Sequence, residues 1–253
     1  MNTSSAKRLV LVVPCYNEAE RLPLFLPGLT EALADIDCLI QVVDDGSQPA
    51  QVKAVEAAVE KSRSRLPNQV ASLLALPVNQ GKGAAIRAGW RAHGESELLG
   101  FVDADGAIAP REVRRFAELA FAAPGQAYFA SRIKMLGRKV DRKFTRHIIG
   151  RVFATLVSLR LKVPVYDTQC GLKILPSAAF PQGVHFEENG FAFDLELMMV
   201  LLDEGFSIEE VPIDWSDVPG SKVHLVRDPI RMYSALQRIA HNRSKRMAPD
   251  KIK

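Results

Sequence analysis

The sequence of 253 residues predicts an α/β fold in which a doubly wound, mostly parallel sheet carries helices on both faces. Two observations predict this class. Short apolar runs rich in Val and Leu alternate with longer segments of helical periodicity. Polar residues also follow several of the apolar runs at the point where each run ends. A composition of 47% apolar and 25% charged residues is typical of a globular protein.

The first half of the chain supplies four strands that alternate with four helices. Short apolar runs, which favour buried strands, occupy residues 8–13, 38–43, 70–76 and 98–102. Helical patterns occupy residues 17–35, 49–65, 83–93 and 110–121. We expect a capping box of Asn17 and Glu20 to begin the first helix, and Pro110 to begin the last. This alternation favours right-handed βαβ units with parallel strands.

The second half is less regular. Further strands are predicted at residues 126–131 and 206–213, and further helices at residues 148–161, 193–205 and 225–242. The sequence has no internal repeat, low-complexity linker or convincing domain boundary. We therefore expect a single domain over residues 1–253, with a basic segment at 132–151 and a basic helical tail at 222–253.

The net charge of +4 is unevenly distributed. Residues 132–151 hold eight Lys/Arg and one Asp, a net +7, and residues 220–253 hold nine Lys/Arg and two Asp, again +7. The remainder of the chain then carries 4 − 14 = −10. Two basic segments on an acidic body indicate an anionic partner that binds at a defined place, although each segment alone is equally compatible with a solvated surface.

The chain has no run that approaches the roughly 20 apolar residues needed to span a bilayer. Its first apolar run is short and ends at Pro14, unlike a secretory signal. Cys15, Cys38 and Cys170 are odd in number and lack metal-ligand spacing. These features predict a cytoplasmic protein with reduced thiols.

Two carboxylates, Asp103 and Asp105, follow the apolar run at 98–102 in the stretch FVDADG. Side chains two residues apart in an extended chain lie on one side, so these like charges repel each other. A Mg²⁺ or Mn²⁺ ion that also binds substrate phosphates would compensate the repulsion. The alternative is an ordinary Asx-turn.

Other polar residues extend this pattern. Asp44 and Asp45 follow the second apolar run, where acidic residues of nucleotide-binding folds meet a ribose or a base, although a capped turn is the alternative. Lys82 lies between two glycines at a helix start that suits a phosphate, unless it is a solvated turn residue. Arg132 and Arg146 lie in the basic segment, and arginine suits bidentate phosphate contacts.

A series of motifs along the chain resembles the family-2 glycosyltransferases, which have the GT-A fold. In order, these motifs are VVPCYNEAERL, VVDDGS, NQGKGAAIRAGW, FVDADG, ASR, DTQCGLKIL, GFAFDLELMMVLLDEG, and EEVPIDW with PGSKV. Within the family they resemble the polyprenyl-phosphate sugar transferases, over about residues 8–240. DTQCG, FAFDLEL and PGSKV are more specific to this group than the acidic pair.

This resemblance implies metal-dependent, inverting transfer of glucose or mannose from a donor of the UDP-glucose or GDP-mannose class to a polyprenyl phosphate. Asp103 and Asp105 would bind Mg²⁺ or Mn²⁺, and Arg132 and Arg146 would bind the acceptor phosphate. The residues expected to contact the donor are Pro14, Tyr16, Glu18, Asp44, Asp45, Lys82, Asp103, Ala104, Asp105 and Lys222.

The nature of the acceptor decides whether a general base is needed. A lipid phosphate is already anionic near neutral pH and needs positioning by arginines, whereas a hydroxyl acceptor needs a carboxylate base, for which Asp167 and Asp194 are the candidates. The basic segment 132–151 favours phosphate. We expect the two basic segments and the helix at 148–161 to associate with the inner face of a membrane, and we expect no nucleic-acid partner.

Three other classes share parts of this pattern. A sugar-nucleotide pyrophosphorylase would carry a Gly-rich, Arg-containing signature after its first strand, where this chain reads PCYNEAERL. A phospho-receiver module would place its acidic pair after the first strand, whereas Asp44 and Asp45 follow the second. An inactive member of the glycosyltransferase family is disfavoured by the intact Asp103 and Asp105.

Overall fold

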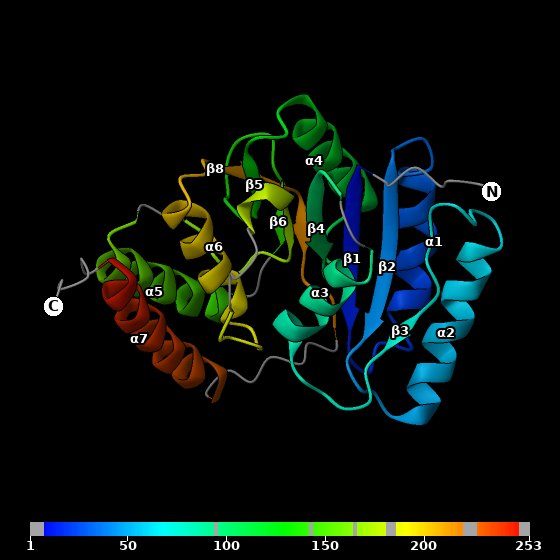
Figure 1. Ribbon diagram of the computed structural model, residues 1–253, viewed down its shortest axis with the longest axis horizontal. Helices are drawn as coiled ribbons and strands as arrows, with labels where there is room; N and C mark the ends of the chain where they lie inside the picture. The colour runs from blue at the N-terminus through cyan, green and yellow to red at the C-terminus, as the bar shows by residue number, and fades with distance from the viewer. Residues whose placement is uncertain are drawn as a thin grey trace, which may run out of the picture.

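The computed structural model describes residues 8–93, 96–141, 144–163, 166–180, 186–219 and 227–247, with backbone alone for residues 144–149, 227–230 and 244–247. The strands of its main sheet are β1 (Leu9–Cys15), β2 (Cys38–Asp44), β3 (Leu74–Ala75), β4 (Leu98–Val102), β5 (Ala127–Ser131), β7 (Leu172–Pro176) and β8 (Ile208–Pro212). Their order across the sheet is β3-β2-β1-β4-β7-β5-β8 (Figure 1). Two short strands, β6 (Val140–Asp141) and β9 (Trp215–Ser216), pair separately.

The main sheet is mixed, with one strand running against the others. β1, β2, β3 and β4 are parallel to one another, and β5 is parallel to β8. β7 lies antiparallel between β4 and β5. The prediction of a mostly parallel sheet is therefore confirmed. The strand predicted at residues 70–76 is shorter in the structure, where only Leu74–Ala75 and an isolated bridge at Val70 pair with β2. It lies at the edge of the sheet, where a strand has a neighbour on one side only.

The helices alternate with these strands and mostly follow the predicted ranges. They are α1 (Leu22–Ala32), α2 (Pro49–Arg63), α3 (Lys82–Arg91), α4 (Pro110–Ala122), α5 (Phe144–Leu161), α6 (Phe193–Asp203) and α7 (Arg227–Met247). The start predicted for α1 is wrong. Asn17 has a left-handed φ of 54° and accepts a hydrogen bond from the backbone N–H of Gln48, so it secures the loop after β1 instead of capping a helix.

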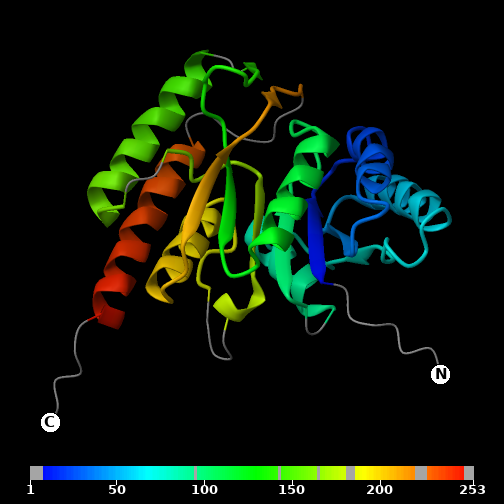
Figure 2. The same ribbon diagram turned by 90° about the horizontal axis from the view of Figure 1, so that it is seen from above.

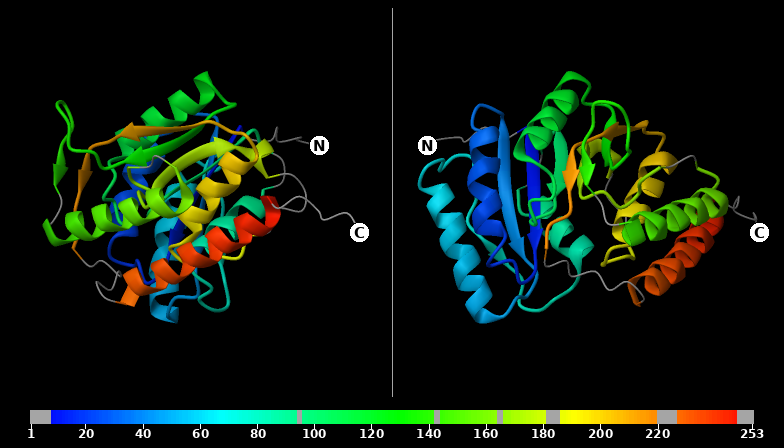
Figure 3. Two further views of the ribbon diagram at one scale, coloured as in Figure 1. Left: turned by 90° about the vertical axis from the view of Figure 1, so that its left-hand side faces the viewer. Right: turned by 180° about the vertical axis from the view of Figure 1, so that it is seen from behind.

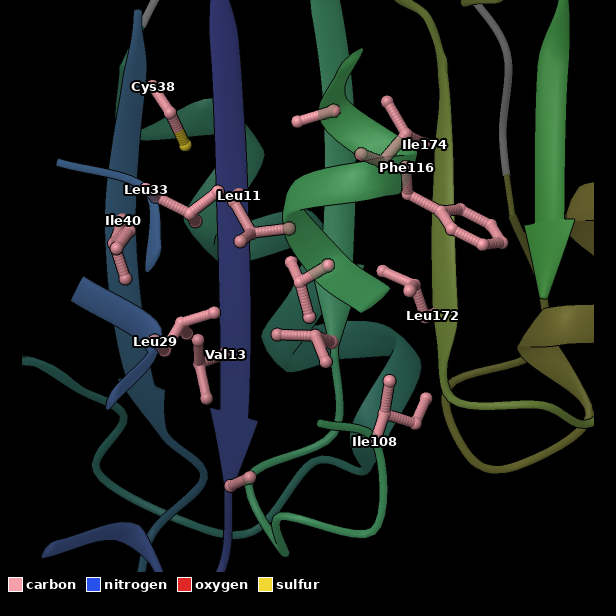
Figure 4. Close-up of a cluster of buried hydrophobic side chains, with 14 of the residues drawn as sticks. Leu11, Val13, Leu29, Leu33, Cys38, Ile40, Ile108, Phe116, Leu172 and Ile174 are labelled. Carbon is pink, nitrogen blue, oxygen red and sulfur yellow. The ribbon is translucent and has the colours of Figure 1, made fainter. Parts of the chain in front are cut away.

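Apolar side chains cover both faces of the sheet because successive residues of a strand point to opposite sides. Leu9, Leu11 and Val13 of β1 pack with α1, α2 and α4, whereas Val10 and Val12 pack with α3, α5, α6 and α7. Figure 4 shows part of the first cluster, with side chains of β1, β2 and β7 against those of α1 and α4. Figures 2 and 3 show the resulting layers, with α5 and α7 side by side.

Two further predictions concern the cysteines and the membrane. Cys15, Cys38 and Cys170 are free and buried. Within the ranges that the structure describes, none of the helices combines the length and the apolar character needed to cross a bilayer.

Candidate active site

A cavity of about 760 Å³ opens where β1, β2 and β4 end, at the edge of the sheet where ligands of open α/β folds bind. The residues that line it end or follow these strands, begin α3, precede α6, and lie between Arg231 and Arg238 of α7. The predicted donor-site residues that line it are Pro14, Tyr16, Glu18, Asp45, Lys82, Asp103, Ala104 and Asp105. The fold thus brings most of the predicted set into one cavity.

Asp103 and Asp105 lie on the wall that extends β4. The backbone N–H of Asp103 donates to the carbonyl oxygen of Gly171 at 2.8 Å, and the Ala107 N–H donates to Oδ1 of Asp105 at 3.0 Å. Burial and the charge of Asp103 raise the pKa of Asp105, against the opposing effect of the Ala107 hydrogen bond. The charge of Asp103 therefore acts on Asp105 in the direction that the sequence predicts.

The donor atoms of this pair suit a hard divalent cation, which prefers carboxylate oxygens. No group of three or more His, Cys, Asp or Glu side chains in the described ranges is arranged to hold a metal ion. An ion bound to Asp103 and Asp105 would therefore complete its shell with water and substrate oxygens, as magnesium does at phosphate-transfer sites. The residues present fit a metal that is shared with a diphosphate.

The raised pKa of Asp105 predicts a measurable effect on stability. Because the folded state binds this proton more tightly than the unfolded state, the contribution of Asp105 to stability falls as the pH rises from about 4 through the raised value. Asp105→Asn should therefore raise the melting temperature of metal-free protein near pH 7, and the gain should shrink toward pH ~4. Thermal melts of wild type and Asp105→Asn in the presence of a chelator test this. Equal melting temperatures of the two proteins near pH 7 would contradict the repulsion between Asp103 and Asp105.

Arg21 is a site residue that sequence reasoning missed. Its Nε donates to Oε2 of Glu18 at 2.6 Å, and both side chains line the cavity. Burial lowers the pKa of Arg21, but the ion pair with Glu18 and the charges of Asp105 and Asp103 raise it by more. The pKa therefore lies above its usual value. Nη1 of Arg21 is buried with no hydrogen-bond partner in the described part of the chain. This guanidinium gives the cavity a fixed cation near the acidic pair.

The two aspartates after β2 have different surroundings. Asp45 lines the cavity, and its carboxylate accepts hydrogen bonds from the backbone of Gln80 and Gly81 at 2.8 Å and from the Asn79 side chain. Asp44 is fully buried and accepts from the backbone and hydroxyl of Ser47. A direct contact of Asp44 with the nucleoside, as the sequence predicted, does not agree with this position. Its side chain instead stabilises the turn to Ser47, which the sequence left as the alternative, but it does not cap α2.

Lys82, at the start of α3, contacts two carboxylates. Its Nζ lies 2.8 Å from Oδ1 of Asp103 and 3.4 Å from Oδ2 of Asp194, which is 1% exposed. Oδ1 of Asp194 binds Nζ of Lys173, a fully buried residue of β7 that also donates to the Cys170 carbonyl. Burial lowers the pKa of Lys82, but the two carboxylates raise it above its usual range. Asp194 is therefore an internal counter-ion that does not line the cavity.

Arg132 follows the last residue of β5 and is not among the residues that line the cavity. Its Nε and Nη2 donate to the two carboxylate oxygens of Asp167 at 2.6 and 2.7 Å. Glu210 of β8 holds this arrangement by accepting from the backbone N–H groups of Tyr166 and Asp167. Although burial lowers the pKa of Arg132, the ion pair with Asp167 and, more weakly, the charge of Asp103 raise it above its usual range.

The remaining predicted residues are outside what the structure describes. The side chain of Arg146 is among these, although its backbone lies in α5, and Lys222 lies in the segment 220–226. Their predicted roles stay predictions. The contribution of α7 was missed, since its basic pattern suggested a solvated tail. Arg238 of α7 instead lines the cavity and binds Oε1 of Glu188 through Nε and Nη2.

The family model of glycosyl transferase family 2 matches residues 10–180. The chain belongs to this family, and is therefore a glycosyltransferase, as its motifs predicted. Among curated relatives, the dolichyl-phosphate beta-glucosyltransferase of Saccharomyces cerevisiae is 30% identical over 244 residues, which cover 88% of this chain and 71% of the relative. The enzyme of that name from Mus musculus is 31% identical over 237 residues, covering 87% and 71%.

Solved structures confirm the GT-A type of fold. Glucosyl-3-phosphoglycerate synthase from Mycobacterium tuberculosis, in complex with Mn²⁺, uridine-diphosphate and glucosyl-3-phosphoglycerate, superposes with a TM-score of 0.69. The alignment covers 93% of this chain and 80% of the synthase, at 16% identity. Another structure of the same synthase, with Mg²⁺ and uridine-diphosphate, gives a TM-score of 0.67 at 15% identity. At these identities the likeness concerns the fold alone.

Proposed function

We propose that this enzyme transfers glucose from UDP-glucose to the phosphate of a polyprenyl lipid, with Mg²⁺ or Mn²⁺ and with inversion at the anomeric carbon. The observation that carries the proposal is the pair Asp103 and Asp105, which opens into a cavity of about 760 Å³ at the ends of the parallel strands. The names of the curated relatives support glucose as the sugar and dolichyl phosphate as the type of acceptor.

The donor half of the proposal rests on charge complementarity. A divalent ion held by Asp103 and Asp105 would stabilise the negative charge that develops on the departing nucleoside diphosphate. Lys82 and Arg21 place two cations on the same cavity, where they would bind the diphosphate oxygens. Pro14, Tyr16 and Asp45 line the part of the cavity near β1 and β2, where the nucleoside would lie.

The acceptor half rests on the surroundings of Asp167 and Asp194. A hydroxyl acceptor would need one of them as a base, but both are held in ion pairs. Asp194 contacts two lysine ammonium groups, and Asp167 contacts the guanidinium of Arg132. A phosphate oxygen is anionic without a base and needs only to be oriented. Arg132, whose guanidinium is oriented by two hydrogen bonds to Asp167, is the group that we assign to the acceptor phosphate.

The direct test is incubation of the purified enzyme with radiolabelled nucleotide sugars, Mg²⁺ or Mn²⁺, and a short polyprenyl phosphate. We expect labelled glucose to enter the organic phase with UDP-glucose and not in the presence of chelator. Transfer of sugar from GDP-mannose, with none from UDP-glucose, would show that the proposed donor is wrong. Transfer to a hydroxyl compound with no transfer to the lipid phosphate would overturn the proposed acceptor.

We also propose that the enzyme works as a peripheral protein at an anionic membrane surface, through α5. This helix buries Ala154, Val157 and Leu161 against the core. Val152, Leu156 and Leu159 form a second apolar stripe that faces solvent, and Leu159 is 73% exposed. The adjacent residues Arg160 and Lys162 are exposed cations. An exposed apolar stripe beside cations suits the interface of anionic lipids.

This proposal predicts the effect of a charge on the stripe. Leu159→Glu should weaken binding to vesicles of phosphatidylcholine and phosphatidylglycerol by roughly tenfold, because it removes a contact with the acyl region and adds repulsion. Co-sedimentation measures the binding. Leu24→Glu is the matched control, since Leu24 is 84% exposed on α1, at the opposite end of the molecule (Figure 2). Equal binding of Leu159→Glu and wild type would contradict a role for this stripe.

A further inference from the structure

Four charged side chains of alternating sign form a continuous chain from the interior to the cavity. Lys173 of β7 binds Asp194 of α6, Asp194 contacts Lys82 of α3, and Lys82 binds Asp103 after β4. Lys173 and Asp194 are 0% and 1% exposed. The aromatic rings of Phe101 and Phe129 lie about 5 Å from Nζ of Lys173 and close its apolar side. The chain ends at the carboxylate that we assign to the metal.

The two oxygens of Asp103 are not equivalent. Oδ2 packs against the backbone of Gly171, so closely that a Cβ on Gly171 would lie 1.9 Å from it. Oδ1 is the oxygen bound by Lys82 at 2.8 Å. An ion that binds Asp103 from the cavity therefore competes with the Lys82 ammonium for Oδ1.

Lys82 retains a partner when it leaves Asp103. Its Nζ is 3.4 Å from Oδ2 of Asp194, and Asp194 is fixed by its second partner, Lys173. A lysine tethered in this way moves its ammonium over a short distance and stays on the cavity wall that it already lines. A diphosphate bound to the same ion would then lie within reach of Lys82.

We infer that Lys82 is a built-in counter-cation of Asp103, which occupies Oδ1 in the metal-free enzyme and moves onto the donor diphosphate when the metal binds. The inference rests on the proposed function, because it takes Asp103 as a metal ligand and a nucleoside diphosphate as the ligand of the cavity. Lys173 acts as a positioning residue, since its buried charge keeps Asp194 in place as the anchor. The exchange makes metal and donor binding cooperative, since the metal frees the cation that the donor needs.

The test is a pair of binding measurements on Lys82→Met. Free Mn²⁺ is titrated by electron paramagnetic resonance, with and without UDP. The variant should bind Mn²⁺ alone about tenfold more tightly, since a charge-assisted hydrogen bond no longer competes for Oδ1. The factor by which UDP tightens Mn²⁺ binding should fall about tenfold, since the freed cation is missing.

The design separates exchange from a general effect of charge. Removing a fixed positive charge near the ion would also tighten Mn²⁺ binding, but would leave the coupling between Mn²⁺ and UDP at the wild-type factor. Unchanged coupling, or unchanged Mn²⁺ affinity, in Lys82→Met would overturn the inference. Wild-type protein that binds neither Mn²⁺ nor UDP would overturn the proposed function itself. Lys61→Met, which removes an exposed lysine of α2, is the control for net charge.

Lys82→Met should fold, because Asp194 keeps Lys173 as its counter-ion and Asp103 faces the cavity. Thermal melts check this before the titrations. Lys82→Gln is the second variant, since its amide can still donate to Asp194 without carrying a charge. It should show the same gain in Mn²⁺ affinity and the same loss of coupling, and wild-type values for both would overturn the inference.

Discussion

Asp105→Asn is expected to reduce glucosyl transfer by at least about a hundredfold, since an amide is a poor ligand for the ion that stabilises the leaving diphosphate. The fold should survive. The carboxamide retains an oxygen for the Ala107 N–H at the 3.0 Å position, and the change removes the repulsion from Asp103. Transfer of radiolabelled glucose to a short polyprenyl phosphate measures the rate, and circular dichroism measures the fold.

The matched control for this loss is Glu56→Gln, the same carboxylate-to-amide change at an exposed position of α2. It should retain the wild-type rate. A near-normal rate in Asp105→Asn, with Mn²⁺ still bound, would exclude Asp105 as a required ligand. If Asp105→Asn both melts at a higher temperature without metal and loses turnover with metal, the repulsion between Asp103 and Asp105 lowers stability and is retained because the metal site requires it.

Gly171→Ala is expected to lower Mn²⁺ affinity and transfer by roughly a hundredfold, because it displaces Asp103. A Cβ on Gly171 would lie 1.9 Å from Oδ2 and 2.2 Å from Cγ of Asp103. The Asp103 N–H is bound to the Gly171 carbonyl oxygen at 2.8 Å, so the two backbones resist moving apart. The carboxylate must then rotate away from its place beside Lys82. Mn²⁺ titration and the transfer assay measure the two effects.

Gly125→Ala is the control for Gly171→Ala, because a Cβ at Gly125 meets nothing within 4 Å. It should bind Mn²⁺ and turn over like wild type. Wild-type Mn²⁺ affinity in a folded Gly171→Ala variant would mean that the position of Asp103 tolerates the methyl group, and that the packing of Oδ2 against Gly171 does not orient the site.

The parallel strands and the place of the site follow from patterns that are local in sequence. The apolar runs that end in Asp44-Asp45 and in Asp103-Ala104-Asp105 predict two strands whose carboxyl ends share one edge, and β2 and β4 lie there on either side of β1. The capping box at Asn17 was wrong for a tertiary reason. Its side chain bonds to the loop after β2, a contact that spans 31 positions and that no local pattern records.

Local patterns decided which residue types gather at the strand ends, because strand period and loop chemistry are set by neighbours in the chain. Only the tertiary structure decided their partners. It turned Asp45 toward the cavity, brought Arg21 to the acidic pair, and joined Lys82 to Asp194 and Lys173. For Asp194 and the two lysines, the physical reason is that a buried charge needs an opposite charge beside it, and here that charge comes from a distant element.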